Sequence, residues 1–406
     1  MAGRRQKPTR AKLRAEQERA AARVFVPGAA DVCIVGGGAA GLVAGIVAAE
    51  AGVSAVVLER DLICGRTILA TGNGRCNFAN AVLDPDLYHG SSFVAETCGG
   101  GWLDDVLRFF EASGLAWAEE DGGRLYPLSR QAASVRNVLL ERARRAGVVL
   151  APGREVIRLD PETEAGPVSV TWRDRFGDEK THELAARRVV LSVGGRGTKV
   201  AGLEKLSTRA SSPVLCPIAC EGPEGLLDAL DGRRVQCEAT LLRDGHAVAT
   251  ETGEVLFRSY GVSGIAVFNL SRHAKSGDVL SLDLLPSLDE ARARKLARNT
   301  LDGLLDPVIA EVLTGLTSGN EEAISFARHF ELTVTGIAQP EKAQVTRGGF
   351  ATDCFDPPSL AASSMPWLHA CGEALDVDGP CGGYNLAWAW KSGMAAGAAA
   401  AKEALG

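Results

Sequence analysis

The chain contains a strand–turn–helix–strand segment, at residues 31–59, that strongly limits the fold around it. Residues 31–35 form a short apolar run rich in β-branched side chains, which predicts a buried strand. Gly36-Gly37-Gly38-Ala39-Ala40-Gly41 follows and fits the pattern G-x-G-x-x-G. A helix of small and apolar residues is expected over 39–51, and a second strand over 53–58. This order predicts an α/β fold that binds a nucleotide at the first turn.

Each glycine of the motif has a separate physical task. Gly36 lets the chain turn sharply out of the strand, and Gly38 leaves room for a pyrophosphate against bare backbone. Gly41, with Ala39 and Ala40 beside it, lets the helix pack closely on the sheet. The helix N-terminus offers unpaired N–H groups and the positive end of its dipole to the phosphates. We favour nucleotide binding over an ordinary glycine-rich turn, because all the parts occur in the required order.

An acidic residue closes the second strand. Glu59 lies eighteen residues after Gly41, where its carboxylate can accept hydrogen bonds from a ribose diol. We expect an adenosine ribose without a 2′-phosphate, because the carboxylate would repel that phosphate. Arg60, the next residue, weakens this preference.

Charge is distributed unevenly along the 406 residues. The net charge is −6, and residues 1–30 hold eight Lys/Arg against two Glu, a surplus of +6 that leaves −12 for the rest. Residues 1–28 lack the apolar segment of a secretory signal and are expected to form a basic, solvated tail, disordered or partly helical. The alternative is an arm that contacts RNA or a membrane. The acidic remainder argues against nucleic acid as a partner, and no apolar run reaches the ~20 residues that span a bilayer. We expect a soluble, cytoplasmic protein.

The ten cysteines indicate reduced thiols rather than a disulfide framework, because no signal peptide accompanies them. The sequence contains no C-x-x-C. Cys216 and Cys220 have no second Cys/His pair nearby to complete a zinc site, so we expect no bound metal.

A second unusual segment, at residues 65–80, is a loop rich in Gly, Asn and Arg. Gly and Asn favour turns, so such a loop is a weak signal by itself. It can nevertheless wrap a polar cofactor with backbone N–H groups, and Arg75 would lie near an anion. Cys76 is a candidate redox thiol, although we favour a buried structural thiol because no partner cysteine lies near it in sequence. Five residues are expected to contact the cofactor: Gly72, Gly74, Arg75, Cys76 and Asn77.

Two later strands also end in glycines, where backbone can approach a ligand closely. Residues 189–193 form one strand, and residues 367–371 form another, in which His369 is expected to be a packed residue. A helix then opens at two glycines and runs to Lys402, and its N-terminus can hold the electron-rich edge of a ring system. The candidate cofactor contacts here are Gly194, Gly195, Gly372, Glu373, Gly382, Gly383, Tyr384 and Asn385.

The middle of the chain has a different pattern. From about residue 213 to 285, short strands alternate with turns, which predicts a small antiparallel barrel or sheet. Residues 288–329 show apolar side chains at helical spacing, and residues 330–345 return to strands. This pattern predicts an all-β part with a helical insertion.

Together these motifs resemble the FAD-dependent flavoprotein family that includes 3-dehydro-bile-acid Δ4,6-reductase, also described as aminoacetone-oxidase-like NAD(P)/FAD-dependent oxidoreductases. The residues that carry the resemblance are 36–41, 72–77, 261–264 and 372–390. It implies FAD as the cofactor and a discontinuous Rossmann-like domain with an inserted β-barrel that carries a small helical insertion. The expected bounds are 29–200 and 346–406 for the FAD-binding domain, 201–286 and 330–345 for the barrel, and 287–329 for the helices.

The resemblance also implies positions along the cofactor. Gly372-Glu373 would approach the ribityl chain or the pyrophosphate, and the helix after Gly382-Gly383 would point at the flavin pyrimidine edge and favour the reduced cofactor. Family members also carry a further G-D-G and a G-H segment after the strand that ends at Gly194-Gly195. Here residues 196–212 run directly into the first barrel strand.

The leading interpretation is an FAD-dependent oxidoreductase that transfers hydride through flavin N5 to or from an activated carbon, with an enone or a steroid as the class that the resemblance implies. The candidate catalytic residues are Arg75, Asn77, Tyr384 and Asn385. Tyr384 or Tyr126 is the candidate proton donor. One dinucleotide motif is visible, so NADH or NADPH, if either is the donor, would dock transiently.

Two alternatives stay open. One is a flavin-dependent tRNA-modifying or RNA-binding protein that uses the basic residues 4–23 as an arm. The other is a flavin-binding protein with a degenerate catalytic site. The sequence leaves the substrate, the electron donor and the oligomeric state open.

Overall fold

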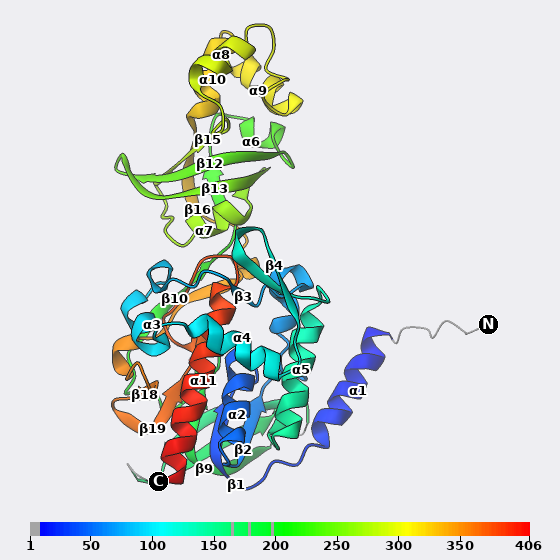
Figure 1. Ribbon diagram of the computed structural model, residues 1–406, viewed down its shortest axis with the longest axis vertical. Helices are drawn as coiled ribbons and strands as arrows, with labels where there is room; N and C mark the ends of the chain where they lie inside the picture. Colours follow the sequence, from blue (N-terminus) through cyan, green and yellow to red (C-terminus); the bar gives the residue numbers. More distant parts are fainter. Residues whose placement is uncertain (1–8, 164–165, 178–179, 196–198) are drawn as a thin grey trace, which may run out of the picture. The chain divides into compact units, whose positions relative to one another are not determined.

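The computed structural model describes residues 9–163, 166–177, 180–195 and 199–406. The chain divides into two compact units (Figure 1). Unit 1 comprises Met1–Ser211 and Arg347–Gly406, and unit 2 comprises Ser212–Thr346. Unit 1 is therefore discontinuous in sequence, with unit 2 inserted into it. The first boundary lies eleven residues beyond the predicted one at residue 200.

Unit 1 is built on a mixed sheet. Its strands, within the described residues, are β1 (Ala29–Val35), β2 (Ala55–Glu59), β6 (Val149–Pro152), β7 (Arg154–Pro161), β8 (Val168–Asp174), β9 (Thr181–Leu191), β18 (Ala361–Ala362) and β19 (Met365–Ala370). The order is β18-β19-β9-β1-β2-β6, and β8 joins β7 to β9. β1 runs parallel to both β2 and β9, with Val32 opposite Ala55 and Arg188. The predicted α/β fold is confirmed.

Two helices, α2 (Ala39–Glu50) and α11 (Tyr384–Leu405), lie along each other and pack on this sheet (Figure 1). Their backbones touch through small residues. A Cβ on Gly393 would lie 2.5 Å from Ala40 O, and a Cβ on Gly397 would lie 2.5 Å from Ala44 O. Glycine at these two positions is therefore what allows the close approach.

Further elements complete unit 1. They are α1 (Arg10–Ala22), α3 (Ser91–Cys98), α4 (Trp102–Ala112), α5 (Ala132–Arg145), β3 (Ala79–Asn80), β4 (Trp117–Glu120) and β5 (Arg124–Pro127). The last three strands form a small sheet in the order β3-β5-β4. β10 (Thr208–Val214) and β17 (Val345–Phe350) pair where the chain leaves and re-enters unit 1.

Residues 10–22, expected to be part of a disordered or partly helical tail, form helix α1. Thr9 caps this helix by accepting a hydrogen bond from Lys12 N at 3.3 Å. Its C-terminal end is anchored, because Ala21 is buried and Arg154 Nη2 donates to Ala21 O at 3.3 Å. Among the described residues no helix is long and apolar enough to cross a membrane.

Unit 2 is a closed antiparallel barrel with helices added to it. The barrel order is β11-β14-β13-β12-β15-β16, which confirms the predicted barrel. The strands are β11 (Ile218–Glu221), β12 (Arg234–Arg243), β13 (His246–Arg258), β14 (Gly261–Ser263), β15 (Val279–Asp283) and β16 (Phe330–Ile337). The helices are α6 (Leu226–Ala229), α7 (Ile265–Leu270), α8 (Glu290–Leu296), α9 (Pro307–Leu316) and α10 (Asn320–Arg328).

The motif at residues 261–264 serves the barrel itself. A Cβ on Gly261 would lie 2.3 Å from Ile218 O, and a Cβ on Gly264 would lie 2.4 Å from Glu254 O. Gly264 is also the N-cap of α7. These glycines let β14 close the barrel and turn directly into a helix.

The α2–α11 contact predicts that two helical Gly→Ala substitutions differ in their effect on unit 1. Alanine favours a helix by about 0.5–1 kcal/mol over glycine, but at Gly397 the new methyl group would meet a carbonyl oxygen. We expect Gly397→Ala to lower the free energy of unfolding of unit 1 by about 1–3 kcal/mol. Denaturant unfolding followed by tryptophan fluorescence measures this, because all six tryptophans lie in unit 1.

Gly315→Ala is the control. Gly315 lies in α9 of unit 2, and a Cβ there would meet nothing within 4 Å. The tryptophan transition of this variant should match that of the wild type. An unchanged or raised midpoint for Gly397→Ala would contradict the close packing of α2 on α11.

Candidate functional site

The turn from β1 into α2 is closed by backbone contacts. Gly36 has φ 105°, and its N–H donates to Leu58 O at 2.8 Å. A Cβ on Gly41 would lie 1.9 Å from Gly36 O. Ser192, directly after β9, donates its hydroxyl to the same oxygen at 2.7 Å. Ser192 was not singled out from the sequence, because nothing local shows that it reaches a turn 156 residues away.

The N-terminus of α2 has no side-chain cap, so its backbone N–H groups can bind an anion. Gly38 is the N-cap and makes no side-chain capping bond. A Cβ on Gly38 would meet Thr67 Oγ1 at 3.7 Å and nothing closer. The N–H groups of a first helical turn, here those of Ala39 and Ala40, have no acceptor inside the helix, and the helix dipole adds positive charge. This geometry suits a pyrophosphate.

Glu59 lies at the end of β2 with its carboxylate held by backbone. Its Oε2 accepts from Gly37 N at 2.6 Å and its Oε1 from Asp61 N at 2.7 Å. The side chain is 8 % exposed, and this burial raises the pKa of the Glu59 carboxyl, against a smaller lowering by the two N–H groups. Each oxygen keeps further acceptor capacity, so a ribose diol can donate to it. Arg60 is exposed.

Part of the predicted loop at residues 65–80 is helical. Residues Ile68–Gly74 form a 3₁₀ segment that is interrupted at Thr71, Gly72 and Asn73, where the dihedral angles are not helical. Gly72 and Gly74 have φ values of 54° and 84°. Glycine accepts these angles without strain, so the loop can bend twice within three residues.

Cys76 is a structural thiol. It is fully buried, and burial raises its pKa to about 12. A thiol with so high a pKa stays protonated at neutral pH and is a poor nucleophile. The expected burial of Cys76 is thus observed, and the absence of a redox role stays a prediction.

Asn77 carries an unsatisfied group. Its side-chain oxygen Oδ1 is buried and has no hydrogen-bond partner among the described residues. Leaving a buried polar atom unpaired costs about 1–3 kcal/mol. An N–H donor of a bound ring would remove this cost, so Oδ1 marks a position where a ligand fits.

The same loop is joined to the N-terminus of α11. Asn80 Nδ2 donates to Gly382 O at 2.9 Å, and a Cβ on Gly383 would lie 2.3 Å from Ala79 O. Gly383 is the N-cap of α11, with φ 101° and no side-chain capping bond. The open N-terminus of α11 and the unpaired Asn77 oxygen therefore belong to one local structure.

Gly372 brings the loop after β19 to the first turn of α2. It has φ 65°, and a Cβ on it would lie 2.9 Å from the Ala40 Cβ. Its carbonyl accepts from Trp388 Nε1 at 3.1 Å, and its N–H donates to Ser392 Oγ at 2.9 Å. Glu373 follows as a half-buried side chain.

The candidate catalytic residues of α11 contact the loop before the helix. The Asn385 side chain accepts from Gly379 N at 2.9 Å and donates to Gly379 O at 2.8 Å. Its amide thus braces the loop. The carbonyl of Tyr384 accepts from the Tyr88 hydroxyl at 2.9 Å, and the two rings meet edge to face at 6.0 Å.

A buried ion pair that the sequence analysis missed fixes the same loop. Arg347 Nε and Nη2 bind the Asp378 carboxylate at 2.5 and 2.9 Å, and Asp378 is fully buried. Gly348 N donates to Asp376 Oδ1 at 2.9 Å. Asp376 and Asp378 are two residues apart in the 372–379 segment. Their partners lie 28 and 31 residues earlier, in β17, so no local sequence pattern predicts these contacts.

Gly194 and Gly195 lie at the end of the strand neighbouring β1. Gly194 has φ 69°, and Gly195 O accepts from Ser211 Oγ at 3.2 Å. The segment that family members carry after these glycines would start at residues 196–198, which lie outside the described residues.

These segments form one site that FAD fits. The first turn of α2 would hold the pyrophosphate, and Glu59 the adenosine ribose. Asn77 and the N-terminus of α11 would hold the flavin ring, with Gly372 between the two helix ends. The fit rests on the unpaired Asn77 oxygen and on two helix N-termini that no side chain caps.

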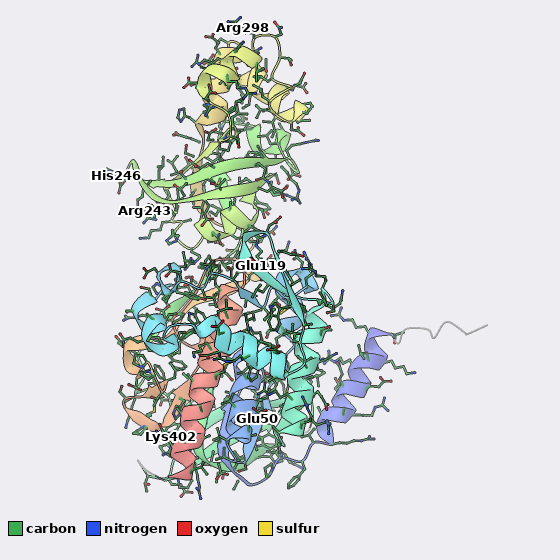
Figure 2. The ribbon with its side chains drawn as sticks, in the orientation of Figure 1. Glu50, Glu119, Arg243, His246, Arg298 and Lys402 are labelled. Carbon is green, nitrogen blue, oxygen red and sulfur yellow. The ribbon has the colours of Figure 1, made fainter. Side chains whose placement is uncertain are left out.

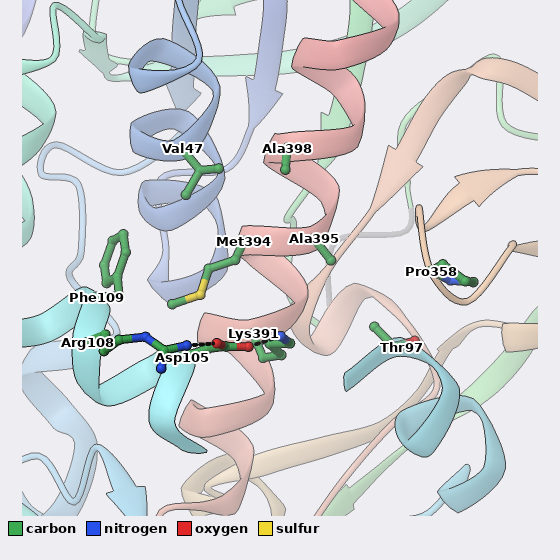
Figure 3. A pocket seen from close by; sticks show the side chains of 10 residues that line it. All are labelled: Val47, Thr97, Asp105, Arg108, Phe109, Pro358, Lys391, Met394, Ala395 and Ala398. Atoms are coloured by element: carbon green, nitrogen blue, oxygen red, sulfur yellow. Dashed lines mark hydrogen bonds and ion pairs between the residues drawn. The ribbon is translucent and has the colours of Figure 1, made fainter. Parts of the chain in front are cut away.

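A pocket of about 450 Å³ lies elsewhere in unit 1, among α2, α3, α4 and α11 (Figure 3). Figure 3 shows Asp105 between Arg108 and Lys391, with Lys391 Nζ 2.5 Å from Asp105 Oδ2. This hydrogen bond lowers the pKa of Asp105. None of the residues that line the pocket is a predicted cofactor contact. The pocket is therefore separate from the site described above.

The pKa of Glu59 leads to a prediction about pH. A protonated carboxyl loses acceptor capacity, so FAD binding should weaken as the pH falls through the raised pKa and stay constant above it. Glu59→Gln should bind FAD about 10–100-fold more weakly, because a hydrogen bond to a charged acceptor is lost. The affinity of this variant should also lack the acidic decline, which a fluorescence titration of FAD between pH 4 and 8 would measure.

Glu96→Gln, at an exposed position on α3, is the control and should keep both the affinity and its pH dependence. An acidic decline that persists unchanged in Glu59→Gln would assign the titration to another group.

Comparison with known proteins identifies the family of the chain. The model of the HI0933-like protein Rossmann domain matches residues 30–399. The chain is 32 % identical over 413 residues to 3-dehydro-bile acid Δ(4,6)-reductase from Clostridium scindens, covering 91 % of this chain and 98 % of that protein. It is 26 % identical over 402 residues to the ribosomal RNA dihydrouridine synthase of Escherichia coli, covering 90 % and 96 %.

Among solved structures, 3-ketosteroid-Δ4-(5α)-dehydrogenase from Rhodococcus jostii is similar in fold, with a TM-score of 0.52 and 17 % identity, covering 93 % of this chain and 98 % of that one. The resemblance seen in the motifs is thus confirmed over nearly the whole chain. The chain belongs to the HI0933-like family of FAD-binding Rossmann proteins and is an oxidoreductase.

Proposed function

We propose that this enzyme saturates a carbon–carbon double bond conjugated to a carbonyl group, with NADH or NADPH as a transient electron donor. The observation that carries the proposal lies in unit 1, where two helix N-termini have no side-chain cap and the buried Asn77 oxygen has no hydrogen-bond partner among the described residues. When bound, the flavin supplies hydride transfer to or from carbon.

The names of two relatives favour this reaction class. A 3-dehydro bile acid with Δ4,6 unsaturation has alkenes conjugated to a ketone, and uridine has an alkene conjugated to a carbonyl of its base. In both compounds hydride adds at one alkene carbon and a proton at the other. Negative charge develops on the carbonyl oxygen during hydride addition, so hydrogen-bond donors to this oxygen lower the barrier.

The chain offers residues for the proton and the charge. The N-terminus of α11 favours negative charge on the cofactor edge beside it. Tyr384 and Tyr126 remain the candidate proton donors. Tyr126 is 8 % exposed, and the Arg75 guanidinium lies 4.3 Å from its ring centroid. Asn385 acts as a positioning residue, because both ends of its amide are bound to the loop before α11.

The test starts with the absorption spectrum of the FAD-loaded protein under anaerobic conditions. Addition of NADH or NADPH should bleach the flavin bands, and a Δ4-3-ketosteroid or a uridine-containing RNA should then restore them. Bands that persist with both donors would refute the NAD(P)H link. Reduced bands that no conjugated alkene restores would refute the substrate class.

The Asn77→Ala variant tests the proposed cofactor site. Its FAD-free form should melt at the wild-type temperature or above, because the lost oxygen had no partner. Added FAD should stabilise this variant less than it stabilises the wild type, by mass action at the weaker site. Equal stabilisation of both proteins would place the flavin away from Asn77.

RNA is the second candidate substrate, and helix α1 is the feature that favours it. Residues 10–23 carry five Lys/Arg against two Glu, and all five basic side chains are exposed. The expectation that nucleic acid is no partner therefore stays a prediction, since relatives of similar length are named for ribosomal RNA. A basic helix of this kind would bind phosphates without reading sequence.

Neutralising α1 separates the two substrates. Arg10→Gln, Lys12→Gln and Arg19→Gln together should weaken RNA binding and lower the slope of log affinity against log salt by about 2–3. Turnover of a steroid should not change. The control is the removal of three exposed charges from α8 and the residues after it in unit 2, Arg292, Lys295 and Arg298. An equal loss of RNA affinity in the control variant would mean that the effect comes from net charge and not from α1.

A further inference from the structure

Two arginines and one glutamate meet beside the proposed flavin site. Arg75 comes from the loop before β3, Glu120 from the end of β4, and Arg130 from the turn before α5. Arg75 Nη2 lies 2.6 Å from Glu120 Oε1, and Arg130 Nη1 forms an ion pair with the same oxygen. Figure 2 labels Glu119, the residue before Glu120, on this strand. These three residues form the Arg75–Glu120–Arg130 cluster, which carries one net positive charge.

The ring of Tyr126 orients the two guanidinium groups. Their central carbons lie 4.3 and 5.5 Å from the ring centroid, for Arg75 and Arg130 respectively. Tyr126 is buried, so its ring is a fixed platform. Arg130 has φ 56°, a left-handed value that a residue with a side chain adopts at a cost and that is often found at binding sites. The arginines are therefore held with their donors converging on one position.

The carboxylate at that position can be exchanged. The side chains of Arg75, Arg130 and Glu120 are 43 %, 37 % and 31 % exposed. Ion pairs with this much exposure add little to stability, because water screens them. The fold therefore does not depend on Glu120. The oxygen atoms of an incoming carboxylate or phosphate can accept the same hydrogen bonds from the two arginines.

The cluster is close to the cofactor loop. A Cβ on Gly72 would lie 3.7 Å from Tyr126 Cε1 and 2.9 Å from Asn77 N. The Tyr126 platform and the backbone of Asn77 thus both lie next to Gly72. An anion bound by Arg75 and Arg130 would be next to the loop that carries the unpaired Asn77 oxygen.

We propose that Arg75 and Arg130 bind one oxyanion of the substrate, a carboxylate or a phosphate, and that Glu120 occupies this position until the substrate arrives. The inference rests on the proposed function, because it names a group on the substrate of that same site. A steroid acid and an RNA strand both carry such a group, whereas an uncharged steroid does not.

Titration of the FAD-loaded protein with inorganic phosphate, followed by calorimetry at low ionic strength, tests the site directly. Glu120→Gln should bind phosphate about 10-fold more tightly than the wild type, because the competing charge is gone. Adding Arg75→Gln or Arg130→Gln to this variant should remove the gain. Acetate in place of phosphate shows whether the carboxylate is accepted as well.

Glu141→Gln is the matched control. Glu141 also lies between two arginines, Arg144 at 2.7 Å and Arg145 at 4.0 Å, but on the exposed face of α5 without an aromatic platform. A gain in Glu141→Gln as large as in Glu120→Gln, or a gain that survives loss of both cluster arginines, would overturn the proposal. If Glu120→Gln does not fold, Arg130→Gln in the wild-type background must weaken phosphate binding.

Steady-state kinetics identify the source of the oxyanion. If the substrate is a steroid, the Glu120→Gln variant should have a lower KM for a steroid carboxylate but not for its methyl ester. If the substrate is RNA, this variant should have a lower KM for a uridine oligonucleotide but not for uridine. Equal changes for charged and uncharged forms would contradict the inference. The phosphate titration needs no turnover, so it distinguishes a failure of this inference from a failure of the proposed reductase activity.

Discussion

The close backbone contact between α2 and α11 is the interaction on which the site depends. Ala40 and Ala44 of α2 face Gly393 and Gly397 of α11, so the helices run in the same direction. Ala40 is the second residue of α2 and Gly393 the tenth of α11, a stagger of eight residues, or ~12 Å along the axis. A larger side chain at either glycine would push the two helices apart and change the spacing of their N-termini.

The positions of the two helix N-termini and of Glu59 determine where positive and negative charge lie in the candidate site. Each of the two helix N-termini carries partial positive charge, and neither has a side-chain cap that would compete with a ligand. Glu59 places negative charge beside α2, where a ribose donates hydrogen bonds, and two backbone N–H groups keep that carboxylate in place. An uncapped N-terminus costs a free helix stability, so both ends gain from binding an electron-rich ligand.

The sequence predicts those parts of the site that are encoded locally. Gly36, Gly41 and Glu59 follow from one motif, because strand, turn and helix are neighbours in the chain. The roles of Arg75 and Asn385 do not, since Glu120 lies 45 residues from Arg75 and the loop that Asn385 braces has no fixed pattern. Ser192 and Arg347 could not be found either, because their bonds to Gly36 and Asp378 exist only after the sheet has formed. The short strands of unit 2 were predictable from their alternation with turns, whereas the closed barrel was expected from the family resemblance.

The relatives of the chain act on very different molecules, according to their names, yet they align with it over nine-tenths of its length. A fold shared by such relatives can keep the residues that build it, while the residues that recognise the substrate differ. Exposed clusters such as Arg75, Glu120 and Arg130 suit this second role, because altering them disturbs the fold little. The buried pair of Arg347 and Asp378 suits the first, since loss of one partner would leave a charge in the interior. Substrate specificity in such a fold would therefore change at exposed ion pairs near the flavin, and the core that positions the flavin would stay fixed.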